Sequence, residues 1–460
     1  MRLAAALRRL AEIERATRPA GPEVTAALAA RWEQLPAAVR SPSQMLGRKF
    51  TGCEATHGVF PACNFGCRPC YLPSNSNRVA LDPDRTLAEV ERQMSYLRQH
   101  RGPGQYAQLI GGEVSLLPPD VHAEALQVMR RHGRFPMSFT HGDFDYDYLE
   151  RLAVGRDGTR RFDILSFAVH IDTTMYGRRA AARPSGEGQL HPERRRVKDM
   201  FERLQREHGV RHHLAHNMTV TPANVDEVAD VVRVCRDLGY RMCSFQPAAE
   251  VGDPRRWDGS YAALTDDRVW AEIERGVGRR LPHRALEVGD PRCNRVTWGL
   301  WSAGRYVPVA EDDHPGDLAA RDAFFRVLPG NLLFASPPRT VARVARALFA
   351  HPRDIPVALR WGARLARRLG ARGLVSGVQP ATYVMHSFMD ADDVQAAWHL
   401  LQRDQVASDP RIRATQERLS ACAYGMAHPD RDEVVPACVQ HSVLDEVENA
   451  HLLRQLPLLT

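Results

Sequence analysis

Six short β-prone segments alternate with longer helical segments between residues 48 and 252. The helical segments place apolar residues at helical spacing, and the short segments are rich in β-branched and aromatic residues. Parallel strands need a long crossover, usually a helix, so this alternation predicts a parallel sheet covered by helices. Six such units within about 200 residues predict an α/β fold built on a partial (β/α)6 barrel.

The pattern also places the individual elements. We expect strands at Phe50–Val59, Tyr106–Ile110, Met137–Thr140, Ile164–Ile171, Leu214–Val220 and Met242–Pro247. We expect helices near residues 86–100, 119–132, 146–153, 192–208 and 224–238. Parallel barrels carry their chemistry at the C-terminal ends of the strands, so polar residues at those ends are candidates for a functional site.

Three parts of the chain differ in pattern. Residues 1–47 are expected to be a helical and connective N-terminal extension, and residues 48–252 the barrel. Residues 253–460 are expected to be an α-rich extension that binds substrate. Within it, residues 254–315 look irregular, and residues 390–460 look helical. Residues 321–370 look like arginine-studded amphipathic helices broken by prolines.

Composition narrows the class of protein. Hydrophobic residues make up 44% of the 460 residues and charged residues 25%, as in a soluble globular protein. The net charge of +7 is small for this length and favours a solvated basic face over a patch that docks on anionic lipid or nucleic acid. No apolar run is long enough for a spanning helix, and the N-terminus lacks signal-peptide features. We therefore expect a cytoplasmic protein, with peripheral membrane contact left open.

Three of the nine cysteines, Cys63, Cys67 and Cys70, fall in a C-x3-C-x2-C spacing. A tight loop of three thiolates can converge on one metal assembly, and thiolates are the ligands of iron–sulfur clusters. A [4Fe-4S] cube held by three cysteines leaves one iron open to a small chelating ligand. Two alternatives are a structural zinc site completed by His57 or Cys53, and a chance grouping of buried thiols.

This cysteine segment resembles the cluster motif of the radical S-adenosylmethionine (SAM) superfamily, which follows the first strand of a TIM-like partial barrel. The resemblance extends over roughly residues 48–250 and includes Gly111-Gly112-Glu113 after the second expected strand. In the family this GGE motif binds the amino group of SAM. The chemistry fits, because two glycines permit close backbone approach and Glu113 offers a carboxylate to an ammonium group.

The resemblance implies further cofactor contacts at His141 after the third strand, Asp172 after the fourth and Gln246 at the end of the sixth. As isolated residues, Asp172 could equally cap a helix and His141 could belong to a turn. Two departures from the family pattern stand out. Many family members have an aromatic residue just before the last cluster cysteine, and this chain has Pro69 there. A contact with the adenine of SAM at this position would then come from the backbone or from Tyr71. The fifth strand lacks a Gly-x-Ile-x-Gly pattern, which leaves Asn217 or Thr219 to serve instead.

The resemblance also implies a reaction. Family members transfer one electron from a reduced [4Fe-4S] cluster to SAM, and the resulting 5′-deoxyadenosyl radical takes a hydrogen atom from the substrate. An enzyme of oxidoreductase or transferase type is implied, together with an electron donor such as flavodoxin or ferredoxin. The cofactor carries the difficult chemistry, so the sequence identifies no catalytic acid or base.

Three cysteines of the C-terminal part, Cys293, Cys422 and Cys438, resemble the auxiliary-cluster extensions of the family, such as the SPASM type of peptide-modifying members. This resemblance implies a second iron–sulfur cluster, for which Cys53, Cys235 and Cys243 are further candidate ligands. The alternative is that these cysteines are small buried hydrophobic residues.

Short C-terminal segments are distantly similar to the branch of the superfamily that contains archaeal tetraether lipid synthases: Ser244–Pro247, Asp290–Cys293 and Met385–Asp390. Residues 321–370 could then cradle acyl chains between cationic edges, or could be two core-packing helices. Three functions remain open: a radical SAM enzyme acting on a lipid or other apolar small molecule, a radical SAM enzyme modifying a peptide, and a non-catalytic iron–sulfur or zinc protein.

Overall fold

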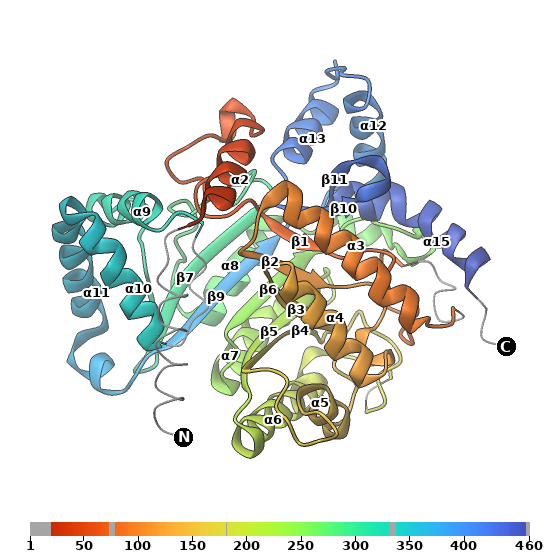
Figure 1. Cartoon of the computed structure of the whole chain (residues 1–460), viewed down its shortest axis with the longest axis horizontal. Coiled ribbons are helices and arrows are strands. Elements are labelled where there is room, and N and C mark those ends of the chain that lie inside the picture. Colours follow the sequence, from red (N-terminus) through yellow and green to blue (C-terminus); the bar gives the residue numbers. More distant parts are fainter. Residues whose placement is uncertain (1–19, 73–78, 181, 331–336, 457–460) are drawn as a thin grey trace.

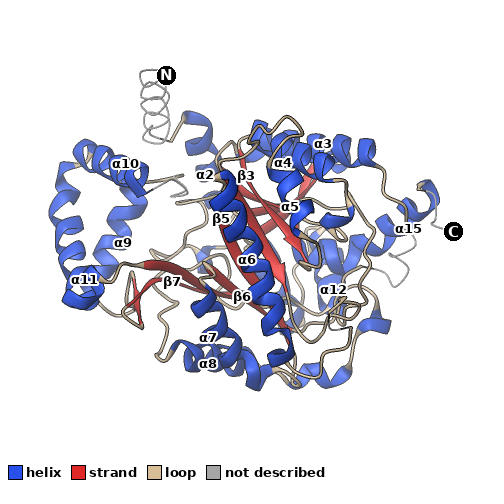
Figure 2. Ribbon diagram, turned by 90° about the horizontal axis from the view of Figure 1, so that it is seen from below, coloured by secondary structure: helices blue, strands red, loops and turns tan. Residues whose placement is uncertain are grey.

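A single curled sheet of 11 strands forms the centre of the protein in the computed structural model, which describes residues 20–72, 79–180, 182–330 and 337–456 (Figure 1). The strand order is β11-β10-β1-β2-β3-β4-β5-β6-β9-β7-β8. Helices pack along the outside of the sheet (Figure 2). The α/β fold and the partial barrel expected from the sequence are confirmed.

The barrel strands run parallel from β1 to β6. They are β1 (Cys53–Ala55), β2 (Gln105–Leu109), β3 (Arg134–Thr140), β4 (Ile164–His170), β5 (Arg211–Val220) and β6 (Met242–Pro247). The connecting helices are α3 (Pro83–Arg101), α4 (Pro119–Arg131), α5 (Tyr146–Ala153), α6 (His191–His208) and α7 (Val228–Leu238). Local sequence sets several helix ends: Asp82 and Asp145 cap α3 and α5, and Gly209 and Gly239 end α6 and α7 in left-handed conformation.

The C-terminal part adds strands to both sides of this barrel sheet. β9 (Gln379–His386) pairs in parallel with β6, and β10 (Tyr424–His428) pairs in parallel with β1. Antiparallel strands lie outside them: β7 (Asn294–Ser302), β8 (Arg305–Pro308) and β11 (Glu433–Pro436). The expectation that residues 254–315 are irregular is therefore wrong, since they contain α8 (Asp266–Val277), β7 and β8. Residues 390–460 are likewise not helical throughout.

The remaining helices lie at the two ends of the chain and around the added strands. They are α2 (Pro22–Glu33), α9 (Pro315–Val327), α10 (Pro337–Ala350), α11 (Ile355–Val375), α12 (Ala391–Leu401), α13 (Pro410–Ser420), α14 (Ala437–Val439) and α15 (Asp445–Gln455). Of the expected N-terminal extension, residues 1–19 lie outside the described residues, and the rest contains α2. None of the described helices combines the length and apolarity needed to cross a lipid bilayer.

The two faces of the sheet carry different side chains. The largest hydrophobic cluster fills the space between the sheet and the outer helices and includes Leu109, Phe167 and Phe245. Side chains alternate along a strand, so neighbouring positions project to the inner, concave face. Several of these inner residues are apolar and only partly buried: Tyr106, Met137, Phe139, Ile164 and Met242. The same face also carries polar side chains, among them Ser166, His213 and Gln246, so it is a mixed surface with apolar parts.

Candidate functional site

The loop that carries Cys63, Cys67 and Cys70 follows β1 and lies at the C-terminal edge of the parallel strands. Backbone hydrogen bonds fix it to the segment after β4: Gly66 N donates to Tyr176 O at 2.8 Å, and Arg68 N donates to Thr174 O at 3.0 Å. The cysteine loop therefore lies at the edge where a parallel barrel carries its chemistry.

The Gly111-Gly112-Glu113 segment packs directly against this cysteine loop. Gly112 N donates to Phe60 O at 2.6 Å, and Glu113 N donates to Ala62 O at 2.8 Å. A Cβ atom at Gly112 would lie 1.9 Å from Ala62 O, and one at Gly111 would lie 2.8 Å from Phe60 O. The two glycines are thus needed for the contact between the two loops, a reason beyond the close cofactor approach expected from the sequence.

Glu113 is buried and joins the ends of β2 and β3. Its carboxylate accepts hydrogen bonds from Ser115 N at 2.9 Å, Thr140 Oγ1 at 2.5 Å and His141 N at 2.8 Å. A carboxylate has about four acceptor positions, so this one keeps capacity for a further donor. These contacts fix the Glu113 carboxylate beside the cysteine loop, and its charge raises the pKa of Cys63 in addition to the larger effect of burial.

His141 lies under the cysteine loop and is buried. Its Nδ1 accepts a hydrogen bond from Asp143 N at 3.0 Å, so the proton lies on Nε2, which donates to Asn64 Oδ1 at 2.9 Å. The imidazole ring stacks on Phe65 with centroids 3.8 Å apart. Burial lowers the pKa of His141, which favours the neutral ring that these two bonds require. His141 therefore connects the end of β3 to the loop of the three cysteines.

Asp172 is buried at the end of β4 and has several donors. It accepts from Thr174 N at 2.8 Å, Thr219 N at 2.7 Å and His170 Nε2 at 2.7 Å. Burial alone would raise the pKa of Asp172, but His170 and these hydrogen bonds outweigh burial and lower it. The carboxylate is thus ionised, and it ties β4 to β5.

Two amide side chains complete the same edge of the sheet. Gln246, at the end of β6, donates from Nε2 to Ser244 Oγ at 2.7 Å. Asn217 on β5 is buried, and among the described residues its Oδ1 has no hydrogen-bond partner. A buried acceptor without a donor costs free energy, so Asn217 Oδ1 fits a polar group of a bound molecule.

The three cysteines are each partly buried, and the pKa values of their thiols shift in the same direction. Burial raises the pKa of Cys63 to about 12, and it raises the pKa of Cys67 and Cys70 as well. Arg256 hydrogen-bonds to Cys70 and partly opposes the rise in its pKa. Thiols with raised pKa values keep their protons unless a metal assembly supplies compensating positive charge. This donor set fits a thiolate-ligated iron–sulfur cluster.

The spacing of these thiols also bears on the zinc alternative. A tetrahedral zinc ion with Zn–S bonds of about 2.3 Å needs sulfur atoms about 3.8 Å apart. Within the described residues, the groups whose ligand atoms all lie within 4.8 Å of one another are two others: His57/His428/Glu448 and Glu150/Glu207/His208. The three thiols do not form such a group, so their sulfur atoms are not all within 4.8 Å of one another.

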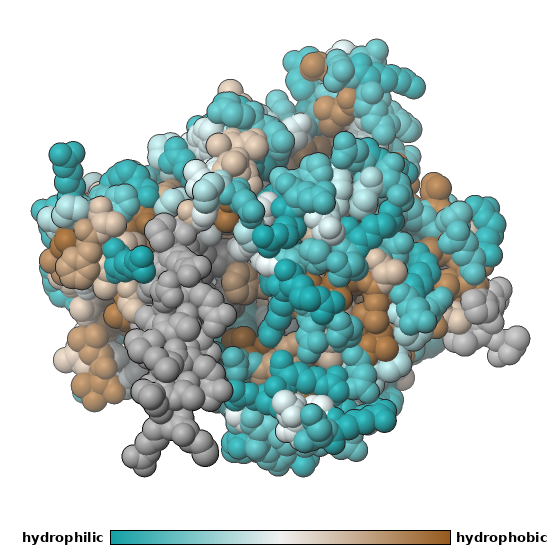
Figure 3. Space-filling view, viewed as in Figure 1, coloured by the Kyte–Doolittle hydropathy of each residue, from teal (hydrophilic) through white to brown (hydrophobic). Residues whose placement is uncertain are grey.

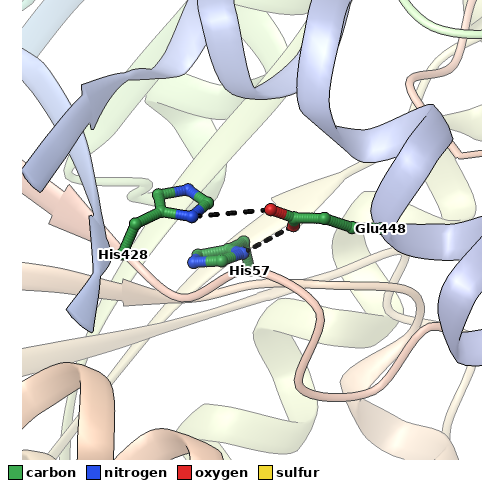
Figure 4. Close-up of side chains that lie close together, drawn as sticks. All are labelled: His57, His428 and Glu448. Atoms are coloured by element: carbon green, nitrogen blue, oxygen red, sulfur yellow. Dashed lines mark hydrogen bonds and ion pairs between the residues drawn. The ribbon is translucent and has the colours of Figure 1, made fainter. Parts of the chain in front are cut away.

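His57, His428 and Glu448 form a partly buried ion-pair group (Figure 4). His57 donates from Nδ1 to Glu448 Oε2 at 2.9 Å and from Nε2 to Ala427 O at 2.7 Å. Burial opposes protonation of His57, but Glu448 and Ala427 O outweigh it and raise the pKa. His57 therefore links α15 to the loop before Cys63.

The structure gathers the C-terminal cysteines in a second thiol group, Cys293/Cys422/Cys438. Arg418 Nε lies 3.1 Å from Cys293 Sγ, and Ser387 N donates to Cys293 O at 2.8 Å. The pKa of Cys438 is raised mainly by burial, with further contributions from Cys422 and Cys293. The three thiols therefore lie within electrostatic range of one another.

The other candidate ligands separate into two sets. Cys235 and Cys243 contact each other in the main hydrophobic cluster, away from the second thiol group. Cys53 lies near Cys422, which contributes to raising its pKa to about 11 after the larger effects of burial and Glu54. Cys53 therefore remains a candidate ligand of a second cluster, whereas Cys235 and Cys243 do not.

Sequence reasoning missed the residues that hold these groups in place. Thr140 on Glu113, Asn64 on His141, Arg256 on Cys70 and Arg418 on Cys293 each act across segments far apart in the chain. Tyr71 has a different place from the one considered: its hydroxyl donates to Gly111 O at 2.7 Å, and its ring stacks on His441. No local motif identifies such contacts.

A partial parallel barrel with a three-thiol loop beside a buried carboxylate defines the class of site. Residues 58–235 match the family model described as Radical SAM superfamily. These residues therefore form a radical SAM domain, the domain of enzymes that use a [4Fe-4S] cluster and S-adenosylmethionine.

Solved structures give weaker similarities. The crystal structure of Streptococcus suis SuiB is 13% identical, with 43% of this chain and 40% of that chain aligned and a TM-score of 0.30. SuiB bound to precursor peptide SuiA is 11% identical over 42% and 38%, with a TM-score of 0.30. Native anSMEcpe with bound AdoMet is 12% identical over 48% and 58%, with a TM-score of 0.31. The chain thus spans less than two thirds of the length of each of these proteins. No curated protein matches it in sequence.

Proposed function

We propose that Cys63, Cys67 and Cys70 hold the [4Fe-4S] cluster and that Gly111, Gly112 and Glu113 form the adjoining SAM site. The single observation that carries this proposal is the contact between the two loops, in which Glu113 N bonds to Ala62 O next to Cys63. Reductive cleavage of SAM, which yields a radical for hydrogen abstraction, is the chemistry that the cofactors supply when bound.

The protein's own residues position the reactants. Glu113 offers its remaining acceptor capacity to an ammonium group, and three hydrogen bonds hold its carboxylate in place. Asn217 Oδ1 offers a buried acceptor to a hydroxyl group on the same edge. His141 and Asp172 have their hydrogen bonds filled within the protein, so we assign them to positioning. Gln246 lies where the adenine contact is expected.

We propose that the substrate is a lipid or another apolar molecule. The inner face of the sheet supports this, because Tyr106, Met137, Ile164 and Met242 lie there only partly buried, and Phe135 is 43% exposed. Apolar side chains left open on a concave face bind apolar surface.

The three segments that resemble the tetraether lipid branch also lie side by side. Ser244 and Phe245 of β6 pair with Val384 and Met385 of β9. The N–H of Ser387, just past β9, bonds to Cys293 O. This adjacency supports a shared role for the three segments near the C-terminal ends of β6 and β9.

Anaerobic reconstitution with iron and sulfide tests the first part of the proposal. The reduced protein should form 5′-deoxyadenosine from SAM, and Cys67→Ala should lose this activity together with its iron. A wild type that binds iron but forms no 5′-deoxyadenosine would instead support a non-catalytic iron–sulfur protein.

Lipid and peptide profiling of a deletion strain tests the substrate class. We expect a change in the lipid fraction that wild type restores and Met137→Asp does not. Met137→Asp should still cleave SAM, because the substitution lies on the inner face and away from the cysteine loop. A change confined to peptides would contradict the lipid proposal.

We further propose that Cys293, Cys422 and Cys438 hold a second iron–sulfur cluster, with Arg418 beside Cys293. The convergence of the three thiols from distant segments supports it. This observation also favours the second candidate function, a peptide-modifying enzyme of SPASM type, because such members carry auxiliary clusters. Iron content tests the proposal. Cys438→Ala should contain about four fewer iron atoms per chain than the wild type, the number in one [4Fe-4S] cluster. The matched variant Cys235→Ala should lose none.

A one-electron donor such as flavodoxin or ferredoxin belongs to the same proposal, as does a cytoplasmic location. The cytoplasm keeps thiols reduced, and all nine cysteines of the chain are free. Substitution of the exposed Arg68, next to Cys67, tests donor binding: Arg68→Glu should slow reduction by an acidic protein donor more than reduction by dithionite.

A further inference from the structure

Helices α10 and α11 carry apolar side chains that nothing in the described structure covers. None of the described side chains of α10 is buried, and Val341 and Phe349 are 68% and 80% exposed. The expectation that residues 321–370 form core-packing helices is therefore wrong for α10. A large apolar patch on a soluble surface usually marks an interaction site.

Helix α11 continues the same surface. Leu359 is 68% exposed, and beyond a kink at Gly370 Leu374 and Val375 are 57% and 88% exposed. Its buried residues are Leu369 and Gly373, at the end that leads into β9. Figure 3 shows apolar side chains at the left of the molecule, where Figure 1 draws α10 and α11.

Arginines interleave with these apolar residues. Residues 337–378 contain nine arginines and no lysine, against Asp354 as the single acidic residue. Without this segment, the 62 basic and 55 acidic residues of the chain become 53 and 54. The positive excess of the whole chain therefore lies in these 42 residues, so the mild net charge hides a strongly basic surface.

The arginines divide into two groups. Arg364 and Arg368 bind the buried Asp317 carboxylate of α9, with Arg364 Nε 3.1 Å from Asp317 Oδ1. These two bonds anchor α11 to the protein. The others on α11 and just before it, Arg353, Arg360, Arg367 and Arg372, are exposed. The helix is thus fixed on one side and presents cationic and apolar groups on the other.

We propose that the α10–α11 surface docks on anionic lipid bilayers. Exposed leucine, valine and phenylalanine among arginines is the pattern of helices that lie in a membrane interface, where apolar groups enter the acyl boundary and arginines meet phosphates. Arginine also suits phosphate because its planar group bonds two oxygens at once. A protein partner would have to match both the apolar residues and a net charge of opposite sign along the same helices.

The docking surface lies toward the open end of the inner face. Val378, 50% exposed, precedes β9, and Phe135, 43% exposed, begins the inner face on β3. The strands from β3 through β6 to β9 run parallel, so these two positions lie at the same edge of the sheet. A bilayer bound at α10–α11 would therefore lie toward the edge of the sheet opposite the cysteine loop.

Vesicle co-sedimentation of the full-length protein tests this inference without SAM, iron or substrate, so its outcome is independent of the proposed activity. Vesicles of phosphatidylcholine with about 30% phosphatidylglycerol should bind the protein, and pure phosphatidylcholine should bind it far less. The triple variant Arg353→Gln/Arg360→Gln/Arg367→Gln should weaken binding on the order of a hundredfold. The double variant Phe349→Ser/Leu359→Ser should weaken it by about tenfold or more.

Matched controls lie on other exposed surfaces. Val406→Ser and Val447→Ser remove side chains that are 75% and 65% exposed, and neither should change vesicle binding. Absent vesicle binding, or equal loss in test and control variants, would overturn the proposal. A dimer in light scattering that Phe349→Ser/Leu359→Ser dissociates, without any vesicle binding, would assign the surface to a second copy of the chain instead.

Discussion

A Cβ atom on Gly112 would lie 1.9 Å from the carbonyl oxygen of Ala62. That distance is far inside van der Waals contact, so no other residue fits without moving one of the two loops. The N–H of Gly112 meanwhile donates to Phe60 O in the same loop. Gly112 therefore sets the spacing between the proposed cluster ligands and Glu113, and both halves of the cofactor site depend on it.

The first prediction concerns Gly112→Ala. The added methyl group must push the cysteine loop away from the Gly111–Glu113 segment, because its nearest neighbours are backbone atoms. We expect the purified variant to keep its far-ultraviolet circular dichroism and to lose most of its iron and of the cluster absorbance at about 400 nm. Gly259→Ala is the matched control, since nothing lies within 4 Å of a Cβ atom there. Full iron loading of Gly112→Ala would contradict the packing argument.

A second prediction follows from His141 under the cysteine loop. His141→Phe keeps an aromatic ring for the stack on Phe65 but removes the bonds to Asn64 Oδ1 and Asp143 N. The buried groups left unpaired should destabilise the loop by about 1–3 kcal/mol. We expect reduced iron loading and faster release of iron to a chelator. His100→Phe is the control, because His100 also stacks on an aromatic ring, Tyr96, but lies on α3 far along the chain from the cysteines.

The barrel strands could be predicted from sequence, and the strands added to them could not. β6 begins and ends where expected, at Met242 and Pro247, because its apolar alternation follows a glycine-ended helix. β10 contains Gly425 and Ala427, which have low strand propensity. It forms because β1 offers it an open parallel edge, and a partner more than 350 residues away leaves no local pattern.

The same distinction separates the two groups of cysteines. Cys63, Cys67 and Cys70 lie close in the chain, so their spacing alone predicts a shared metal assembly. Cys293 and Arg418 are 125 residues apart, and only the fold brings Arg418 Nε to the sulfur atom. The sequence alone makes Cys235 a candidate ligand, because any cysteine can bind a metal. In the fold its side chain lies in the hydrophobic cluster between the sheet and the outer helices.

A third prediction concerns the buried pair of Glu54 on β1 and Arg134 on β3. Arg134 bonds both carboxylate oxygens, at 2.9 and 3.2 Å, and neither side chain is exposed. Glu54→Gln leaves a buried guanidinium without its counter-ion, which should lower the free energy of unfolding by about 3 kcal/mol. Urea unfolding followed by circular dichroism measures this.

The control for this pair is an exposed one of the same types. Glu89 and Arg92 on α3 lie 2.9 Å apart with partly exposed side chains. Glu89→Gln should change the free energy of unfolding by about 0.5 kcal/mol or less. If both substitutions changed the free energy of unfolding equally, burial would not strengthen the contribution of the Glu54–Arg134 pair to stability.

The last prediction is a pH dependence that arises from His57 and Glu448. The pKa of His57 is raised above its ordinary value of 6.5, because the stabilising bonds to Glu448 and Ala427 O outweigh burial. Its contribution to stability is therefore complete below pH 6.5 and is lost as the pH rises through the raised pKa. The pKa of Glu448 is lowered from 4.5, since His57 outweighs burial, so its contribution is present above pH 4.5 and lost as the pH falls further.

The substitution Glu448→Gln should therefore lower the free energy of unfolding most between pH 4.5 and 6.5, where both side chains are charged. We expect a loss of about 2 kcal/mol near pH 6, which shrinks as the pH rises to 9 and His57 loses its proton in the wild type. Urea unfolding of wild type and variant at several pH values measures the difference. Glu446→Gln, an exposed position on the same helix, should show no such trend. A difference between wild type and Glu448→Gln that stays constant from pH 6 to 9 would mean that His57 is not charged, and the link between α15 and the cysteine loop would then be an ordinary neutral hydrogen bond.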